Sequence, residues 1–362
     1  MVKGRERKNA VVYWKKVSSF VFVKNRSEIA MNKLKEAWIK AGYIDEAVPT
    51  GIDLANEIKR LKAEKRAVLM AHYYQTGDIQ DAADIIGDSL ALAQKAVGID
   101  ADIILLAGVH FMGETVKILN PEKKVLIPDM NAGCSLAESC KASDFKQFVE
   151  RHPGYKVISY VNTSADVKAL TDVVVTSSNA VQIVESFPKD EKIIFGPDRN
   201  LGSYINKITG RNMLLWDGAC LVHEEFSLLR IEKLKEVYPE AELICHPECK
   251  HQIVVMSDFV GSTAALLSYV GKSQSKQFIV ATESGILHQM QKKYPDKMFI
   301  AAPPMDSTCG CNECSYMKLN TMQKIYLTLK YEWPEVQVES SIIERARRPI
   351  DEMLRLSAKI GK

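Results

Sequence analysis

The chain carries one pattern three times, and this repeat limits the available folds more than any other feature. Each copy starts with an apolar run that ends in a polar triplet, and a hydroxyl-bearing residue follows 17 positions after the triplet begins. The triplets begin at His72, Tyr160 and His246, and the hydroxyls belong to Ser89, Ser177 and Thr263. A period of about 86 to 88 residues indicates one supersecondary unit present in three copies.

Within each copy, apolar runs of strand length alternate with segments of helical periodicity. The expected strands are 66–71, 103–107 and 125–128 in the first copy, 156–160, 173–175, 193–195 and 213–216 in the second, and 242–245, 254–255, 278–280 and 298–301 in the third. Uninterrupted apolar strands separated by helices are typical of parallel sheets covered on both faces. We therefore expect an α/β protein of three three-layer αβα domains, related by a pseudo-threefold axis, with the active site at their central junction.

The repeat also suggests where the domains divide. We expect a basic extension and a leading helix over 1–45, and repeat domains over 46–142, 143–223 and 224–362, the last of which includes a C-terminal helix from Ser340. The segment 1–30 holds eight basic side chains and two acidic ones. We interpret it as an extension outside the fold; an ordered packing arm and a targeting segment are the alternatives.

Composition excludes several classes of protein. A formal net charge of +3 is too small to indicate nucleic-acid binding, and no apolar run approaches the ~20 residues that a membrane span needs. Eight cysteines without a secretory signal do not predict a disulfide framework. We therefore expect a cytoplasmic protein whose cysteines are metal ligands, reactive thiols or buried apolar side chains.

Some of the cysteines recur with the repeat. The spacing from Ser89 to Cys134 is 45, that from Ser177 to Cys220 is 43, and a group from Cys309 to Cys314 begins at a spacing of 46 from Thr263. Three thiolates match three irons of a four-iron, four-sulfur (4Fe-4S) cluster and leave the fourth iron open as a Lewis acid. The cysteines that do not recur, Cys140, Cys245 and Cys249, are interpreted as buried apolar side chains.

The hydroxyl residues suggest an anion site. Ser89, Ser177 and Thr263 each begin a helix-like segment, with Ser89 expected at the N-cap, and helix N-termini favour carboxylates and phosphates. Each copy also has an aspartate at the twelfth position after the start of its triplet, and we assign these a structural role in packing, caps or turns. They are Asp84, Asp172 and Asp258.

Seven motifs together resemble the quinolinate synthase family over roughly residues 50–325. They are Ala71-His-Tyr-Tyr-Gln75, Gly87-Asp-Ser89, Tyr160-Val-Asn162, Thr176-Ser-Ser-Asn179, His246-Pro-Glu248, Gly261-Ser-Thr263 and Cys314-Ser-Tyr-Met-Lys-Leu-Asn320. The resemblance implies a triangular three-domain enzyme with a central 4Fe-4S cluster. It implies a transferase- or lyase-type reaction of NAD biosynthesis, the condensation of iminoaspartate with dihydroxyacetone phosphate to quinolinate, phosphate and water.

The same resemblance implies roles for individual residues. Those matching the cluster ligands are Cys134, Cys220 and Cys314, although spacing alone favours Cys309 as the third. Those matching the substrate pocket are His72, Ser89, Tyr160, Asn162, Ser177, His246, Glu248 and Thr263, with Tyr74 near the reacting carbons. Glu248 is the expected carboxylate base, with Tyr160, Tyr74 and His246 as further catalytic groups. L-Aspartate oxidase is the expected functional neighbour, because iminoaspartate is unstable.

Three alternatives stay open at this point. The nearest is another 4Fe-4S-dependent dehydratase, acting on a hydroxy acid and needing no phosphate site. A redox-sensing binding protein is suggested by Cys309 and Cys311 beside Cys314, since the role of the first two is either redox or structural. A zinc-stabilised structural protein is the third.

Overall fold

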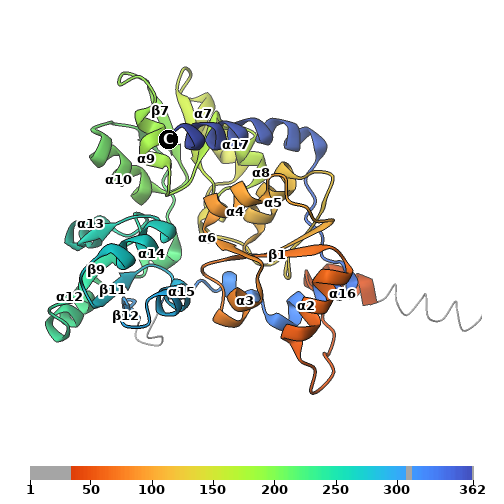
Figure 1. The fold of residues 1–362 in the computed structure, drawn as a ribbon. Helices are drawn as coiled ribbons and strands as arrows, with labels where there is room; N and C mark the ends of the chain where they lie inside the picture. Colours follow the sequence, from red (N-terminus) through yellow and green to blue (C-terminus); the bar gives the residue numbers. More distant parts are fainter. Residues whose placement is uncertain (1–33, 307–311, 361–362) are drawn as a thin grey trace, which may run out of the picture.

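The computed structural model of the protein describes residues 34–306 and 312–360 (Figure 1). The interpretation of residues 1–30 and the roles of Cys309 and Cys311 therefore fall outside the described residues. Within them, the chain forms three four-stranded sheets in which all the strand pairs are parallel. Figure 1 shows the corresponding units as three lobes, coloured orange to yellow, green, and teal.

The three sheets have the same strand order, in which the first strand along the chain lies between the second and the third. The first sheet is β2-β1-β3-β4, with β1 (Ala67–His72), β2 (Ile85–Gly87), β3 (Ile103–Ala107) and β4 (Lys124–Leu126). The second is β6-β5-β7-β8, with β5 (Lys156–Tyr160), β6 (Val173–Val175), β7 (Ile193–Gly196) and β8 (Leu214–Leu215). The third is β10-β9-β11-β12, with β9 (Glu242–Cys245), β10 (Phe259–Val260), β11 (Gln277–Ala281) and β12 (Met298–Ala301). The predicted α/β fold of three repeated units is confirmed.

Helices connect the strands and cover the sheets. In the first unit they are α2 (Leu54–Glu64), α3 (Gly77–Ala82), α4 (Ser89–Ala96), α5 (His110–Leu119) and α6 (Ser135–Glu138). In the second they are α7 (Ala142–Glu150), α8 (Ala165–Lys168), α9 (Ala180–Glu185), α10 (Arg199–Thr209) and α11 (Leu221–Glu224). The third has α12 (Leu228–Val237), α13 (His251–Met256), α14 (Thr263–Lys272), α15 (Ile286–Lys293) and the 3-10 turn η1 (Met317–Leu319), and α16 (Met322–Tyr331) and α17 (Ser340–Ile360) follow.

The last two helices leave the third sheet and pack on the other units. The buried side chains of α16 join a cluster with Leu61 of α2 and Leu69 of β1. Helix α17 contacts β6 and α8, and Figure 1 shows it in dark blue along the green lobe. The predicted C-terminal helix is confirmed, while the domain boundaries stay a prediction. Between residues 34 and 306 and between 312 and 360, no helix is both long and apolar enough to cross a membrane.

The three repeated aspartates hold the sheets together. Each precedes the second strand of its unit and accepts a hydrogen bond from a backbone N–H of the first strand, at 2.7–2.8 Å: Asp84 from Leu69, Asp172 from Val157, and Asp258 from Leu243. The backbone N–H of each aspartate donates in turn to the carbonyl of the same partner. Their predicted structural role is confirmed.

One predicted strand is wrong. Residues 254–255 belong to helix α13, and the second strand of the third sheet is β10, a few residues later. A pair of apolar residues is too short for its periodicity to separate a strand from the buried face of a helix. Here Ile253 supplies the buried position, whereas Val255 is exposed.

Candidate active site

One cavity of about 300 Å³ lies where the three units meet. Its walls include every residue that the sequence predicted for substrate, catalysis or metal: His72, Tyr74, Ser89, Cys134, Tyr160, Asn162, Ser177, Cys220, His246, Glu248, Thr263 and Cys314. Side chains from distant parts of the chain, such as those of His72 and Cys314, thus face one space. A cavity thus lies at the central junction, where the sequence predicted the site.

The parallel sheets explain this convergence. His72 ends β1, Tyr160 ends β5, and His246 follows the last residue of β9, so each triplet leaves the carboxyl end of the first strand of its sheet. Ligands of open α/β sheets bind at that edge, where the loops diverge. The carboxyl edges of the three sheets meet around one axis, so corresponding residues of the three units line the same cavity.

The three hydroxyl-bearing loops are tied together beside the cavity. The Ser178 hydroxyl donates to a carboxylate oxygen of Asp88 at 2.8 Å, and it lies 2.8 Å from the hydroxyl of Ser262. Asp88, Ser178 and Ser262 are the immediate neighbours of Ser89, Ser177 and Thr263. This contact between three units therefore fixes the relative positions of the three predicted substrate hydroxyls.

The expected capping role of Ser89 is wrong. Asp88 is the N-cap of α4 and its carboxylate accepts the N–H of Ala91, while Ser262 is the N-cap of α14. Ser177 lies ahead of α9, whose N-cap is Asn179. Aspartate accepts as well as serine at an N-cap, so the sequence alone did not separate the two adjacent candidates. The hydroxyls of Ser89 and Thr263 are thus not used for capping.

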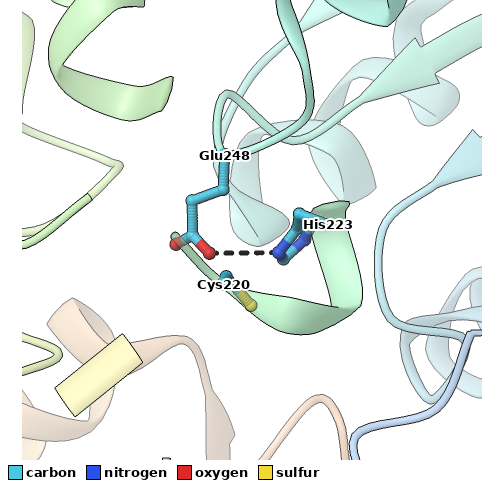
Figure 2. A group of neighbouring side chains, drawn as sticks. All are labelled: Cys220, His223 and Glu248. Carbon is cyan, nitrogen blue, oxygen red and sulfur yellow. Dashed lines mark ion pairs between the residues drawn. The ribbon is translucent and has the colours of Figure 1, made fainter. Parts of the chain in front are cut away.

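Glu248 is a buried carboxylate of the cavity wall that makes two close polar contacts. Its Oε1 accepts a hydrogen bond from the Tyr160 hydroxyl at 2.6 Å, and its Oε2 lies 3.0 Å from Nδ1 of His223 (Figure 2). Burial raises the pKa of Glu248, but the imidazoles of His223 and His246 and these polar contacts outweigh burial and lower it to about 2. The carboxylate is therefore ionised at neutral pH, although its side chain is buried.

Two imidazoles and two phenols near Glu248 are held in their neutral forms. Burial lowers the pKa of His72 and of His246 to about 3, so both imidazoles are uncharged near pH 7. Burial and the charge of Glu248 raise the pKa of Tyr74 and of Tyr160 well above 10. His246 Nε2 lies 3.1 Å from the Ser177 hydroxyl. These four neutral groups can donate hydrogen bonds within the cavity that the Glu248 carboxylate lines.

Each unit contributes one thiol in a similar local setting. Cys134 and Cys220 are the N-caps of α6 and α11, and Cys314 precedes η1. Backbone N–H groups two or three positions after each cysteine lower the pKa of its thiol, which favours a thiolate: those of Leu136 and Ala137, of His223, and of Tyr316 and Met317. Burial nevertheless raises the pKa of all three thiols, that of Cys134 to about 12.

The three sulfurs also influence one another. A charge on Cys314 raises the pKa of Cys134, and a charge on Cys134 raises that of Cys220, so the sulfurs are close enough to repel each other as thiolates. Thiolates gathered in this way require a compensating cation. Three sulfur donors, one from each unit, could hold a metal cofactor at this point of the cavity.

Cys140, Cys245 and Cys249 are buried, as the sequence predicted. Cys140 is buried in a cluster with Phe145, and Cys245 and Cys249 are buried in the core of the third unit. None of the three is among the described residues that line the cavity.

A second donor set overlaps the thiol triad. The ligand atoms of Cys220, His223 and Glu248 lie within 4.8 Å of one another, and this arrangement could hold a metal ion. Figure 2 shows Cys220 and His223 on one short helix and Glu248 on the facing loop. Both sets use Cys220, so a cluster bound to the triad and a single ion bound here would exclude each other.

Sequence reasoning missed four buried groups around the site. The carboxylate of Asp198 accepts the N–H groups of Leu201 and Cys220, and Oε1 of Glu283 accepts the N–H of Cys314. Asp198 and Glu283 each lie two residues after the third strand of their sheet, a signal that the repeat could have given. His223 and Thr282, the other two, have no counterpart in the other units.

A lysine links the third unit to the first. Nζ of Lys318 donates to the backbone carbonyl of Tyr74 and lies 2.8 Å from Oε1 of Glu283. The Glu283 side chain is buried, and burial raises its pKa while Lys318 lowers it. The loop that carries Cys314 is thereby fixed to the loop that carries Tyr74.

Comparison with known proteins agrees with this geometry. The family model described as Quinolinate synthetase A protein matches residues 56–355. A quinolinate synthase from Synechocystis sp. is 55% identical over 305 residues, which cover 84% of this chain and 96% of that protein. Quinolinate synthases from Nostoc punctiforme and Chloroherpeton thalassium are 55% and 53% identical over 306 residues each, covering 84% of this chain and 94% and 95% of theirs. The chain belongs to the quinolinate synthase family.

Proposed function

We propose that this protein is a quinolinate synthase of NAD biosynthesis, which condenses iminoaspartate with dihydroxyacetone phosphate and releases quinolinate, phosphate and water. The observation that carries the proposal is the convergence of three polar triplets, three hydroxyls and three thiols on one cavity. The names of the similar proteins support it, because they cover most of the chain. We further propose that it acts in the cytoplasm, with L-aspartate oxidase as its functional neighbour.

The proposed cofactor is a 4Fe-4S cluster on Cys134, Cys220 and Cys314. The donor set fits, since each unit supplies one sulfur to the cavity wall and nearby backbone N–H groups lower the pKa of each thiol. When bound, a cluster with three protein ligands supplies one iron that acts as a Lewis acid toward oxygen atoms of the substrate. All other steps are assigned to side chains.

The substrates carry carboxylates and a phosphate, and the cavity walls offer donors for them. The proposed donors are His72, Ser89, Asn162, Ser177 and Thr263. The imidazole of His72 is neutral, so it can donate one hydrogen bond without adding a positive charge to the cavity. Helix α14 begins at Thr263 and α4 at Ser89, so the positive ends of two helices of eight or more residues add to the attraction for anions.

Glu248 is proposed to be the base that accepts protons from carbon or nitrogen. A carboxylate with a pKa of about 2 is a weak base while Tyr160 and His223 contact it. Substrate that displaces the Tyr160 hydroxyl would remove one of these contacts. The pKa of Glu248 would then rise, because this contact is one of those that lower it. Tyr160, Tyr74 and His246 would donate hydrogen bonds to substrate oxygen atoms that gain negative charge during the reaction.

The test is direct. Protein reconstituted anaerobically with iron and sulfide is incubated with dihydroxyacetone phosphate and an enzymatic source of iminoaspartate, and quinolinate is measured by mass spectrometry. A matched Cys140→Ala variant, whose thiol is buried away from the cavity, should make quinolinate at the wild-type rate. An intact cluster with no quinolinate would reject the proposal and favour another cluster-dependent dehydratase; an absence of iron would favour the zinc alternative.

A further inference from the structure

Lys168 is a buried charged side chain that the proposed reaction has not used. It is 0% exposed and is the last residue of α8, which packs on α5 of the first unit (Figure 1). Its Nζ donates to the backbone carbonyl of Thr163 and lies 5.3 Å from the centre of the Phe111 ring. Phe111 lines the cavity, whereas Lys168 is absent from the described residues that do so. The ammonium group therefore lies behind the cavity wall.

This ammonium group has no carboxylate partner. In residues 34–306 and 312–360, no carboxylate oxygen lies within 4.0 Å of its nitrogen. Lys117, another buried lysine, has the usual arrangement, with its Nζ 3.2 Å from Oε1 of Glu335. A carbonyl oxygen and an aromatic face stabilise an ammonium group only in part. A buried charge without an opposite charge costs free energy, so Lys168 calls for an explanation.

Negative charges farther away act on the same side chain. Burial lowers the pKa of Lys168 to about 8, although the charges of Glu114 and of an ionised Cys134 act in the opposite direction. The amine is therefore mostly protonated at neutral pH. Glu114 is already engaged, because its Oε2 accepts the N–H of Ala165 at 2.9 Å. The other group, Cys134, belongs to the thiol triad of the cavity wall.

The triad supplies the missing negative charge once it holds metal. Metal coordination deprotonates a thiol, so the three cysteines bind as thiolates. An iron–sulfur cluster held by three thiolates is anionic as a whole, and its reduction potential depends on the charges around it. The attraction between such a cluster and a buried ammonium group is stronger than it would be in water, because the protein interior has a low dielectric constant.

We propose that Lys168 is the buried counter-charge of the thiol triad, and that its ammonium group stabilises the bound cluster and raises its reduction potential. The proposal rests on the proposed cofactor. Cluster binding gives the uncompensated ammonium group an anionic neighbour. Reduction of the cluster adds one electron to this neighbour, so the positive charge favours the reduced form over the oxidised form.

The first test measures how strongly Lys168 and the cluster stabilise each other. Lys168→Met removes the charge and keeps the length and most of the volume of the side chain. Melting temperatures are measured for both proteins, each without the cluster and after anaerobic reconstitution. The rise on cluster binding should be smaller in Lys168→Met, because the charge that the cluster compensates is missing. The lost contact with Thr163 affects both forms of the variant and cancels in this comparison.

The second test is a redox titration with dithionite, followed by electron paramagnetic resonance. At a fixed potential, the ratio of reduced to oxidised cluster should be roughly tenfold lower in Lys168→Met than in wild type, which corresponds to about 59 mV for a one-electron couple. The matched control is Lys117→Met, since this buried lysine is paired with Glu335 and is absent from the described lining of the cavity. It should show the wild-type potential and the wild-type rise in melting temperature.

The contrary results separate the role of Lys168 from the proposed function. If Lys168→Met lowers the melting temperature of both forms equally and keeps the wild-type potential, the lysine only fixes the loop of Thr163; the proposal is then rejected and the proposed function stands. If Lys168→Met gives no folded protein, Lys168→Gln replaces it, and a wild-type potential in that variant rejects the proposal. If reconstituted wild type holds no iron–sulfur cluster, the proposed cofactor and the counter-charge are rejected together.

Discussion

Acid should weaken the folded state through two buried histidines, His72 and His246. Burial lowers the pKa of each to about 3, from an ordinary value of 6.5. Below pH 6.5 the unfolded chain therefore binds protons that the folded chain does not bind. Because the folded-state pKa is depressed, the stabilising contribution is complete above pH 6.5 and is lost as the pH falls toward 3.

The size of the effect follows from the two pKa values. At pH 5 the unfolded histidine is protonated and the folded one is still neutral, so the free energy of unfolding falls by about 1.4 kcal/mol for each of about 1.5 pH units. This amounts to roughly 2 kcal/mol for each histidine. Glu248 does not contribute in this range, because its pKa is 4.5 when unfolded and about 2 when folded.

Urea denaturation under anaerobic conditions at pH 7.5 and at pH 5.0 measures the loss. Between these pH values the free energy of unfolding should fall by about 2 kcal/mol less for His72→Gln than for wild type. Burial also raises the pKa values of Asp198 and Glu283, so these acids change the pH dependence of stability. Their contribution is the same in both proteins and cancels when the two losses are compared. His251→Gln, at an exposed histidine of α13, should lose as much as wild type. Equal losses in wild type and His72→Gln would refute the reasoning.

Three further substitutions test the site. Cys220→Ala should abolish the visible absorbance of the cluster, whereas Cys140→Ala should keep it; an unchanged spectrum in Cys220→Ala would contradict the ligand assignment. Glu248→Gln should keep the cluster and lower kcat by roughly 10²- to 10⁴-fold, and near-normal turnover would exclude Glu248 as the base. Gly285→Ala should lower the melting temperature and the activity together, because the added Cβ would lie 2.8 Å from the Tyr74 backbone. The shift of backbone that this requires costs roughly 1–3 kcal/mol. A wild-type melting temperature and activity would show that the loop of Tyr74 moves without cost.

The repeat made the fold and most of the site predictable. Parallel strands that are buried on both faces are apolar along most of their length, so β1, β5 and β9 could be located from apolar runs in the sequence. The residues just after them had to lie at the carboxyl edges of their sheets. Three related edges around one axis then placed Ser89 and Thr263 in the walls of one cavity, although they belong to the first and the third unit.

Side chains whose partners lie in another unit could not be found in this way. His223 contacts Thr282 and Glu248, and nothing in the repeat marks it, because Ala137 and Met317 stand at the same distance after the other two cysteines. The packing of α17 on the second unit was hidden for the same reason. Its apolar face was visible in the sequence, but a helix pattern does not say which surface will cover it.

The charge of Glu248 couples the parts of the cavity. It raises the pKa of Tyr74, Tyr160 and Cys220, so while the carboxylate is ionised the tyrosines are held neutral and a thiolate is disfavoured. Replacing it with glutamine removes this repulsion and should make Cys220 easier to ionise, which favours cluster binding. A loss of turnover in Glu248→Gln would then follow from the missing base rather than from a missing cluster, and the absorbance of the variant distinguishes the two causes.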